Sequence, residues 1–266
     1  FVSHVIPKLN GTDRCFFSRV NRESWEVLAY AGVNVSRLGV IVHECSSIST
    51  LELAWNHFPW GKKFEDGDVM DQTSFCWQVA ATEKLELLEW AREVKHCEWD
   101  EWTINAAART GNLEMLKYCF SNGCPCDEEQ VCKEAAAGGH LDCLRFLFAK
   151  VKPLRETEKE AAIQATGNGR LEIVKYFVEE RNITDAVKIL LVAAAAWHGQ
   201  LDCLKYLLEE AKVPLDLWGY IAHARYYEHP DCVNYLLEKG CPEPTDEQYA
   251  GFVEYERSKS GQQSGD

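Results

Sequence analysis

One short motif recurs along this chain at nearly constant spacing, and it limits the possible folds more than any other feature. The clearest copy is GHLDCLRFLF, which begins at Gly139. Close copies begin at Gly111, Gly169 and Gly199, and weaker ones at Ser49, Glu83 and Glu228. The corresponding positions are Leu51, Leu85, Leu113, Leu141, Leu171, Leu201 and Pro230. These are separated by 34, 28, 28, 30, 30 and 29 residues. So regular a period indicates one supersecondary unit used repeatedly.

Each unit contains two helical segments. The first is short and rich in alanine, which favours helix and lets a neighbouring helix approach closely. The second carries apolar residues at helical spacing, as in Leu141, Leu144 and Leu147. A glycine between them, such as Gly139, can adopt the left-handed conformation that ends a helix. One such pair cannot bury its apolar face alone, whereas stacked pairs can. The sequence therefore predicts an all-α solenoid of stacked helical hairpins with short turns.

This pattern resembles the ankyrin repeat over roughly residues 45–250. The period is shorter than the usual value of about 33, and the Thr-Pro-Leu-His opening of the first helix is missing. Both differences predict that the β-hairpin fingers between repeats are reduced to tight turns. The resemblance implies a non-catalytic scaffold that binds proteins. Its most specific stretch is Ala135, Ala136, Gly139, His140, Leu141, Leu144 and Leu147.

The two ends of the chain do not fit the repeat. Residues 1–44 contain a pattern that resembles the later part of an F-box, which implies a substrate receptor that contacts a ubiquitin-ligase adaptor. The other interpretation is a helical cap over the open end of the stack. The F-box interpretation predicts one apolar cluster formed by Ile6, Leu9, Phe16, Phe17 and Val20. Residues 251–266, which end in SKSGQQSGD, are expected to form a disordered tail.

Charge and hydropathy exclude several classes of partner. The formal net charge is −14, so a phosphate backbone or an anionic membrane surface would repel the chain. No apolar run approaches the ~20 residues that a membrane span needs. The first residues do not read as a secretory leader, although the chain begins at Phe1 rather than Met. We expect an intracellular monomer.

The 12 cysteines are interpreted as reduced, buried apolar residues. Cys143, Cys203 and Cys232 share one repeat position with Met115 and Ile173, which indicates selection for apolar bulk. A nucleophilic pair of His140 with Cys143 is disfavoured for this reason.

A zinc site at Cys124-Pro125-Cys126 is disfavoured because Gly-Cys-Pro recurs at the same point of the last repeat. We expect no catalytic residue, metal or cofactor. The alternative is an enzyme or metal-binding protein that uses cysteine and histidine side chains between repeats.

The ankyrin resemblance also implies where a partner binds. In such stacks, the two residues that end the first helix lie on the concave side and are released from packing. In this chain they include Arg109 and Thr110, Trp197 and His198, and Tyr226 and Tyr227. Tryptophan, tyrosine and arginine are enriched at binding hot spots. We expect a partly exposed patch for a protein partner of unknown identity, and the alternative is that these residues close the C-terminal end of the stack. The patch comprises Trp197, His198, Arg225, Tyr226 and Tyr227.

Overall fold

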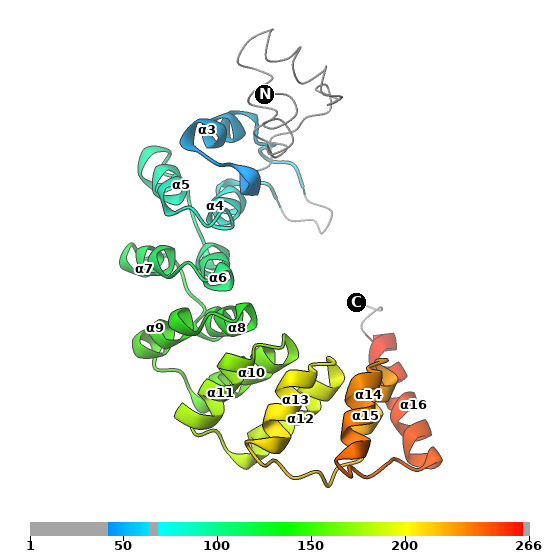
Figure 1. The fold of residues 1–266 in the computed structure, drawn as a ribbon. Helices are drawn as coiled ribbons and strands as arrows, with labels where there is room; N and C mark the ends of the chain where they lie inside the picture. The colour runs from blue at the N-terminus through cyan, green and yellow to red at the C-terminus, as the bar shows by residue number, and fades with distance from the viewer. Residues whose placement is uncertain (1–41, 64–68, 263–266) are drawn as a thin grey trace, which may run out of the picture. The chain divides into compact units, whose positions relative to one another are not determined.

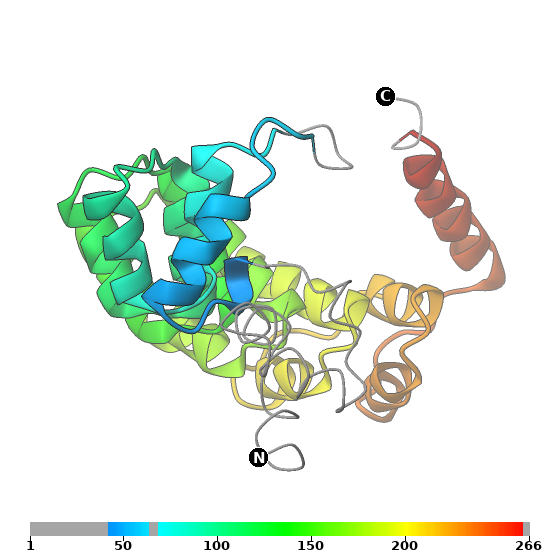
Figure 2. The same ribbon diagram turned by 90° about the horizontal axis from the view of Figure 1, so that it is seen from above.

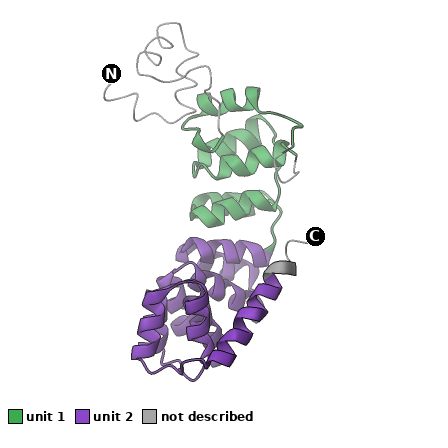
Figure 3. Cartoon of the chain, turned by 90° about the vertical axis from the view of Figure 1, so that its right-hand side faces the viewer, with its two compact units in different colours: residues 1–127 green, residues 128–266 purple. Residues whose placement is uncertain are grey.

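The computed structural model describes residues 42–63 and 69–262, and the chain divides into two compact units (Figure 3). Unit 1 comprises residues 1–127 and unit 2 residues 128–266. The N-terminal segment 1–41 lies outside the described residues, so the F-box-like cluster predicted there is not described. Each unit is built from helical hairpins (Figure 1).

In unit 1, α4 packs against α5, α6 packs against α7, and the two first helices α4 and α6 pack against each other. The preceding helix α3 packs against α5, in the position of a second helix. A π-helical turn, η4, continues α5. The elements are η3 Val42–Glu44, α3 Ile48–His57, α4 Gln72–Ala80, α5 Leu85–Glu89, η4 Trp90–Val94, α6 Glu101–Thr110 and α7 Leu113–Ser121.

In unit 2, the first helices α8, α10, α12 and α14 form one layer and the second helices α9, α11, α13 and α15 form the other. A final helix, α16, packs beside α14 at the end of the unit (Figure 2). The first hairpins are α8 Glu128–Gly138, α9 Leu141–Val151, α10 Arg155–Gly167, α11 Leu171–Lys175 and η5 Tyr176–Glu180. The remaining elements are α12 Asp185–Trp197, α13 Leu201–Glu209, α14 Gly219–Tyr226, α15 Pro230–Glu238 and α16 Asp246–Gln262.

The repeat period in the sequence marks the start of each second helix from α5 onward. The second helices α5, α7, α9, α11, α13 and α15 each begin at the residue that marks the period in the sequence. The described residues contain a single β-bridge, between Lys63 and Val69, in the connection where the step is 34 residues. The predicted all-α fold of stacked hairpins with short turns is therefore confirmed.

Alanine and cysteine form a large part of the buried core. The alanine pairs of the first helices, such as Ala107 with Ala108 and Ala135 with Ala136, are fully buried. Cys143, Cys203 and Cys232 are each 1% exposed. No disulfide joins cysteines of the described residues. The interpretation of these cysteines as buried apolar residues is confirmed.

A residue in the left-handed conformation follows each first helix within three residues. Gly111, Gly139, Gly169 and Gly199 have φ of 77°, 89°, 69° and 69°. Where the repeat has glutamate instead, Glu83 and Glu228 adopt the same conformation, with φ of 63° and 61°. A side chain in this conformation costs roughly 1–2 kcal/mol, which explains the preference for glycine.

A second reason for glycine lies in the next repeat. The residue that follows each glycine position is polar. Its side chain lies over the glycine of the repeat that precedes its own. A Cβ added to Gly199 would lie 2.5 Å from His229 Nδ1, and one added to Gly169 would lie 2.4 Å from Gln200 Oε1. Both distances are too short for real atoms, so a side chain at either glycine would displace the residue that lies over it.

The same polar side chains form hydrogen bonds to the preceding repeat, which we call reach-back bonds. Arg170 Nε donates to Ala137 O at 2.8 Å, and Gln200 Nε2 donates to Gly167 O at 2.9 Å. His229 Nε2 lies 2.9 Å from Trp197 O. In unit 1, Asn112 Nδ2 donates to Glu83 O at 2.6 Å. Each bond satisfies a carbonyl near the end of a helix, where intrahelical donors are lacking.

A parallel set of bonds ties the layer of second helices. Tyr206 donates its hydroxyl hydrogen to Glu179 and Tyr235 donates to Glu209, both at 2.9 Å. Each pair joins one second helix to the one before it. Burial, and then the hydrogen bond to Glu209, raises the pKa of Tyr235 to about 12.

The C-terminal segment differs from the predicted disordered tail 251–266 over residues 251–262, and residues 263–266 lie outside the described residues. Residues 251–262 belong to α16, which runs from Asp246 to Gln262. The helix is held by contacts of Phe252 and Glu256 with α14, which are described below. Within the described residues, no helix is both long and apolar enough to cross a membrane.

We predict opposite stability effects at two equivalent positions. Gly199→Ala should lower the free energy of unfolding by about 2 kcal/mol, because it adds left-handed strain and displaces the His229 ring. Glu228→Gly should raise it by about 0.5–1 kcal/mol, since it removes that strain at a cost in unfolded-state entropy. Urea denaturation measures both changes. As a control, Gly219→Ala in α14, with open space around it, should be neutral or stabilising; equal effects of all three would contradict this account.

We also predict that Cys143, Cys203 and Cys232 label slowly with a thiol reagent in the native protein. All three are buried, and burial raises the pKa of Cys203 and of Cys232 to about 11, which removes the reactive thiolate. Mass spectrometry of digested peptides over time gives each rate, with the partly exposed Cys126 as the internal comparison. Labelling of all three as fast as Cys126 would show that the stack opens readily.

Candidate binding surfaces

Four of the five residues predicted for the patch in unit 2 are in contact, at the C-terminal ends of α12 and α14. The Trp197 ring stacks on His198, with 5.5 Å between centroids and 13° between planes. It also stacks on Tyr227 at 5.3 Å and 27°. Tyr226 meets Tyr227 edge to face at 4.9 Å. We call Trp197, His198, Tyr226 and Tyr227 the aromatic patch.

The repeat register explains why these rings reach the surface. The residues before Trp197 in α12, Ala194 to Ala196, are buried against neighbouring helices. Trp197 and His198 then follow at the end of the helix, and 37% of the Trp197 surface is exposed. Tyr226 and Tyr227 are half-buried. Since each ring packs against the next, the patch is held in one arrangement before any partner arrives.

Arg225, the fifth residue predicted for the patch, is held by other groups. Its guanidinium forms an ion pair with Glu243 at 2.7 Å and lies over the Tyr249 ring at 5.5 Å. Glu243 lies in the connection between α15 and α16, and Tyr249 lies on α16. Arg225 therefore helps to hold the C-terminal segment against α14.

α16 brings further side chains to the edge of the aromatic patch. Phe252 contacts His223 at 4.8 Å and Tyr226 at 5.9 Å between ring centroids. The Tyr227 hydroxyl donates to Glu256 Oε2 at 3.0 Å, although the carboxylate of Glu256 is almost fully buried. This hydrogen bond and burial together raise the pKa of Tyr227 to about 12, with burial the larger cause.

Sequence reasoning missed these α16 residues because the tail was expected to be disordered. A signal was present: Tyr249, Phe252, Val253 and Glu256 are spaced i, i+3, i+4 and i+7, which places them on one helix face. His223 was also missed, since it lies inside the alanine-rich segment of its repeat. Its ring lies 5.7 Å from that of Trp197.

The other two predicted residues, Arg109 and Thr110, end α6 in unit 1. They line a pocket of about 360 Å³ between α4 and α6, which we call the tryptophan pocket. The Thr110 hydroxyl donates to Ala106 O at 3.0 Å. The pocket is lined by Trp77, Ala81, Trp102, Asn105, Ala106, Arg109 and Thr110.

Sequence reasoning missed Trp77, Trp102 and Asn105, because none of them is one of the two residues that end a first helix. Trp102 is in fact 54% exposed. Its spacing of i, i+3 and i+7 with Asn105 and Arg109 places all three on one face of α6, and this signal could have been read from the sequence.

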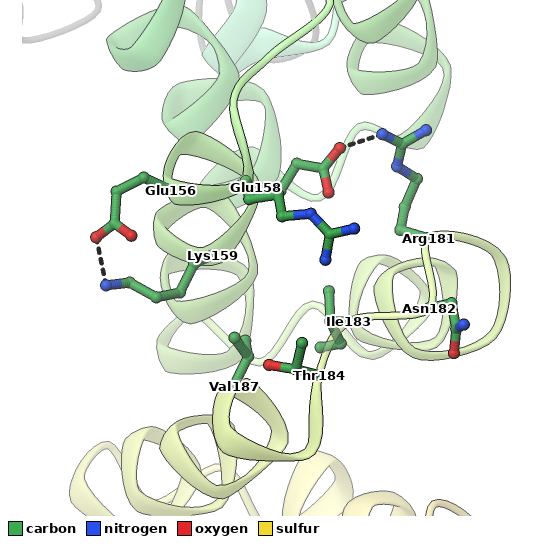
Figure 4. Close-up of a pocket in the computed structure, with 9 residues that line it drawn as sticks. Glu156, Glu158, Lys159, Arg181, Asn182, Ile183, Thr184 and Val187 are labelled. Atoms are coloured by element: carbon green, nitrogen blue, oxygen red, sulfur yellow. Dashed lines mark hydrogen bonds and ion pairs between the residues drawn. The ribbon is translucent and has the colours of Figure 1, made fainter.

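A third hollow, of about 350 Å³, lies between α10 and the N-terminal end of α12 (Figure 4). Its lining is strongly charged, but the charges largely satisfy each other. Glu158 pairs with Arg181, and Glu156 pairs with Lys159. This surface therefore offers little unmet charge to a ligand.

The residues considered for chemistry have structural roles. Cys124 Sγ donates to the carbonyl oxygen of Asp100 at 3.3 Å. Cys143 is buried and presents no accessible thiol. In the described part of the chain, no three histidine, cysteine or acidic side chains are grouped so that they could hold a metal ion.

We predict that Tyr227→Phe loosens α16. The substitution removes a donor from the buried Glu256 carboxylate, which should weaken the docking of α16 by about 1–2 kcal/mol. Hydrogen–deuterium exchange should become faster in residues 246–259 and remain slow in α14. Tyr235→Phe removes the equivalent hydroxyl from the bond to Glu209 and should leave exchange in α16 unchanged. Unchanged exchange in both variants would show that the Tyr227 bond does not hold the helix.

Comparison with known proteins agrees with this geometry. No curated protein matches the chain. The family model described as ankyrin repeats (3 copies) matches residues 104–187, 132–217 and 163–248, which together cover more than half of the chain. Ankyrin repeats mediate protein–protein interactions and are typically non-catalytic, and the match therefore indicates an interaction module. With its helical hairpins, buried alanine pairs and left-handed glycines, the chain belongs to the ankyrin-repeat family.

Proposed function

We propose that this chain is a non-catalytic scaffold that binds a protein partner through the aromatic patch. The observation that carries the proposal is the exposed Trp197 ring, stacked between His198 and Tyr227. Large aromatic side chains held in place lose little conformational entropy on binding, and they dominate the energetics of many interfaces.

The position of the patch in the repeat supports this role. Trp197 contacts the next repeat through its backbone carbonyl oxygen, which lies 2.9 Å from His229 Nε2. Its ring packs against His223 and Tyr227 of the next repeat and still leaves 37% of the residue surface exposed. Arg225 and α16 limit the patch on one side, so the partner would approach over the Trp197 and His198 side.

A finer proposal concerns the remainder of the chain. We assign residues 1–44 to a contact with a ubiquitin-ligase adaptor, which would make the repeats the substrate-binding part of the ligase. The support is the F-box-like pattern in the sequence. The reduced cysteines fit an intracellular location. Co-purification of the full chain with the adaptor tests this assignment, and failure to recover the adaptor would leave only the capping role for this segment.

We predict that the aromatic patch is a binding hot spot. Peptides selected from a phage-displayed library on the full chain should lose about 30-fold or more in affinity to Trp197→Ala and to Tyr226→Ala, because a true anchor contributes ~2 kcal/mol. Isothermal titration calorimetry measures the affinity, and thermal unfolding should change little.

The matched control is Tyr255→Ala, which removes an exposed tyrosine of α16 outside the patch and should leave affinity unchanged. If both patch variants bind the selected peptides normally, or if both unfold, the rings close the stack and do not bind a partner.

A further inference from the structure

Asn105 is one of three residues in the described part of the chain with a buried side-chain polar atom that has no hydrogen-bond partner. It lies in the middle of α6, only 2% of its surface is exposed, and its Oδ1 atom is buried without a hydrogen-bond partner. Buried polar groups are nearly always satisfied, and each exception needs an explanation. By contrast, the buried Thr166 of α10 donates its hydroxyl hydrogen to Ala162 O.

The repeat fold does not require an amide at this position. Asn105 lies six residues before the glycine that ends its helix. The residues at the same point of the other first helices are Trp77, Lys133, Ile163, Ala193 and Ala222. A position that accepts a charged, a branched apolar and a small side chain has no fixed structural role. The destabilising amide of Asn105 is therefore specific to this repeat.

The surroundings of Asn105 are those of a binding pocket. The tryptophan pocket joins the indoles of Trp77 and Trp102 with the methyl groups of Ala81 and Ala106. Trp102 exposes more than half of its surface, which is costly for so large an apolar side chain unless something covers it. Apolar walls with one or two fixed polar groups are the usual layout of ligand pockets.

We propose that the tryptophan pocket binds an extended peptide segment, with one uncharged apolar side chain against the two indoles and the Asn105 amide paired with the peptide backbone. A side-chain amide carries one donor group and one acceptor, as a backbone peptide group does, so the two are complementary. The pocket lining contains no acidic residue, and Arg109 disfavours a cationic side chain. The proposal rests on the proposed function in that its ligand is a protein segment, but it concerns different residues in unit 1.

The test uses a small probe that contains these groups, N-acetylphenylalanine N-methylamide, added to the full chain labelled with ¹⁵N-tryptophan. Nine indole signals are expected, and Trp77→Phe and Trp102→Phe assign the two that matter. Both signals should shift and saturate as the probe is added. Toluene supplies the same apolar ring without peptide groups and serves as the second probe.

Asn105→Leu replaces the amide with an apolar group of similar size. It should weaken binding of the capped phenylalanine about tenfold or more while binding of toluene is retained, and the thermal midpoint should be unchanged or higher. Thr103→Val is the matched control. The Thr103 hydroxyl in the same helix is also buried without a partner, but it does not line the pocket. This variant should leave the affinity for both probes unchanged.

Two results would overturn the proposal. One is equal affinity of wild type and Asn105→Leu for the capped phenylalanine, and the other is a large loss of stability in Asn105→Leu, which would make the amide structural. If that variant does not fold, Trp102→Ala at an exposed position replaces it and should weaken both probes about fivefold or more. Because neither probe experiment involves Trp197 or Tyr226, failure of the aromatic patch and failure of this pocket are separate outcomes.

Discussion

The reach-back bonds are the interaction on which the stacking of these repeats depends. A polar side chain at the start of a second helix crosses over the glycine of the preceding repeat and meets a carbonyl at the end of its first helix, as Gln200 does with Gly167. Where the preceding residue is glycine, the crossing side chain passes close above it, and a Cβ on Gly169 would collide with Gln200; Asn112 instead bonds to the carbonyl of Glu83 itself. The left-handed turn and the close contact between repeats thus both favour glycine at this position. Together they fix where each hairpin turns and how the next one aligns with it.

At the end of each first helix, the backbone carbonyl and the side chain have different roles in this arrangement. The carbonyl oxygens of Ala137, Gly167 and Trp197 lie two residues before the glycine, and each receives a polar side chain of the next repeat. Stacking therefore places little demand on the side chains at this point, which range from a hydrogen atom to an indole. Variation concentrates where packing and register allow it, and the aromatic rings of α12 and α14 occupy such positions.

The stack could be predicted from the sequence because the same residue pattern occurs in several repeats. Leu141 alone does not identify a helix start, but equivalent residues at equal steps do, and the second helices begin at these residues. The contact between Trp197 and Tyr227 was also predictable, since each belongs to the pair of residues that ends the first helix, and their repeats are neighbours. α16 was not foreseen because the chain ends in the polar sequence SKSGQQSGD, and because Phe252 and Glu256 gain their partners only when α14 is in place.

Asn105 shows the limit of reading a single sequence. An asparagine in an alanine-rich helix is ordinary in a sequence. Its significance lies in a missing hydrogen-bond partner, which only the packed structure reveals. The repeat then supplies the comparison that one protein rarely offers, because five sister positions show what the fold accepts at that point. Lysine, isoleucine and alanine satisfy the stack without a buried amide. A polar group retained at a cost to stability, beside an exposed indole, fits a general rule: departures from local consistency in a folded chain concentrate where the chain binds something.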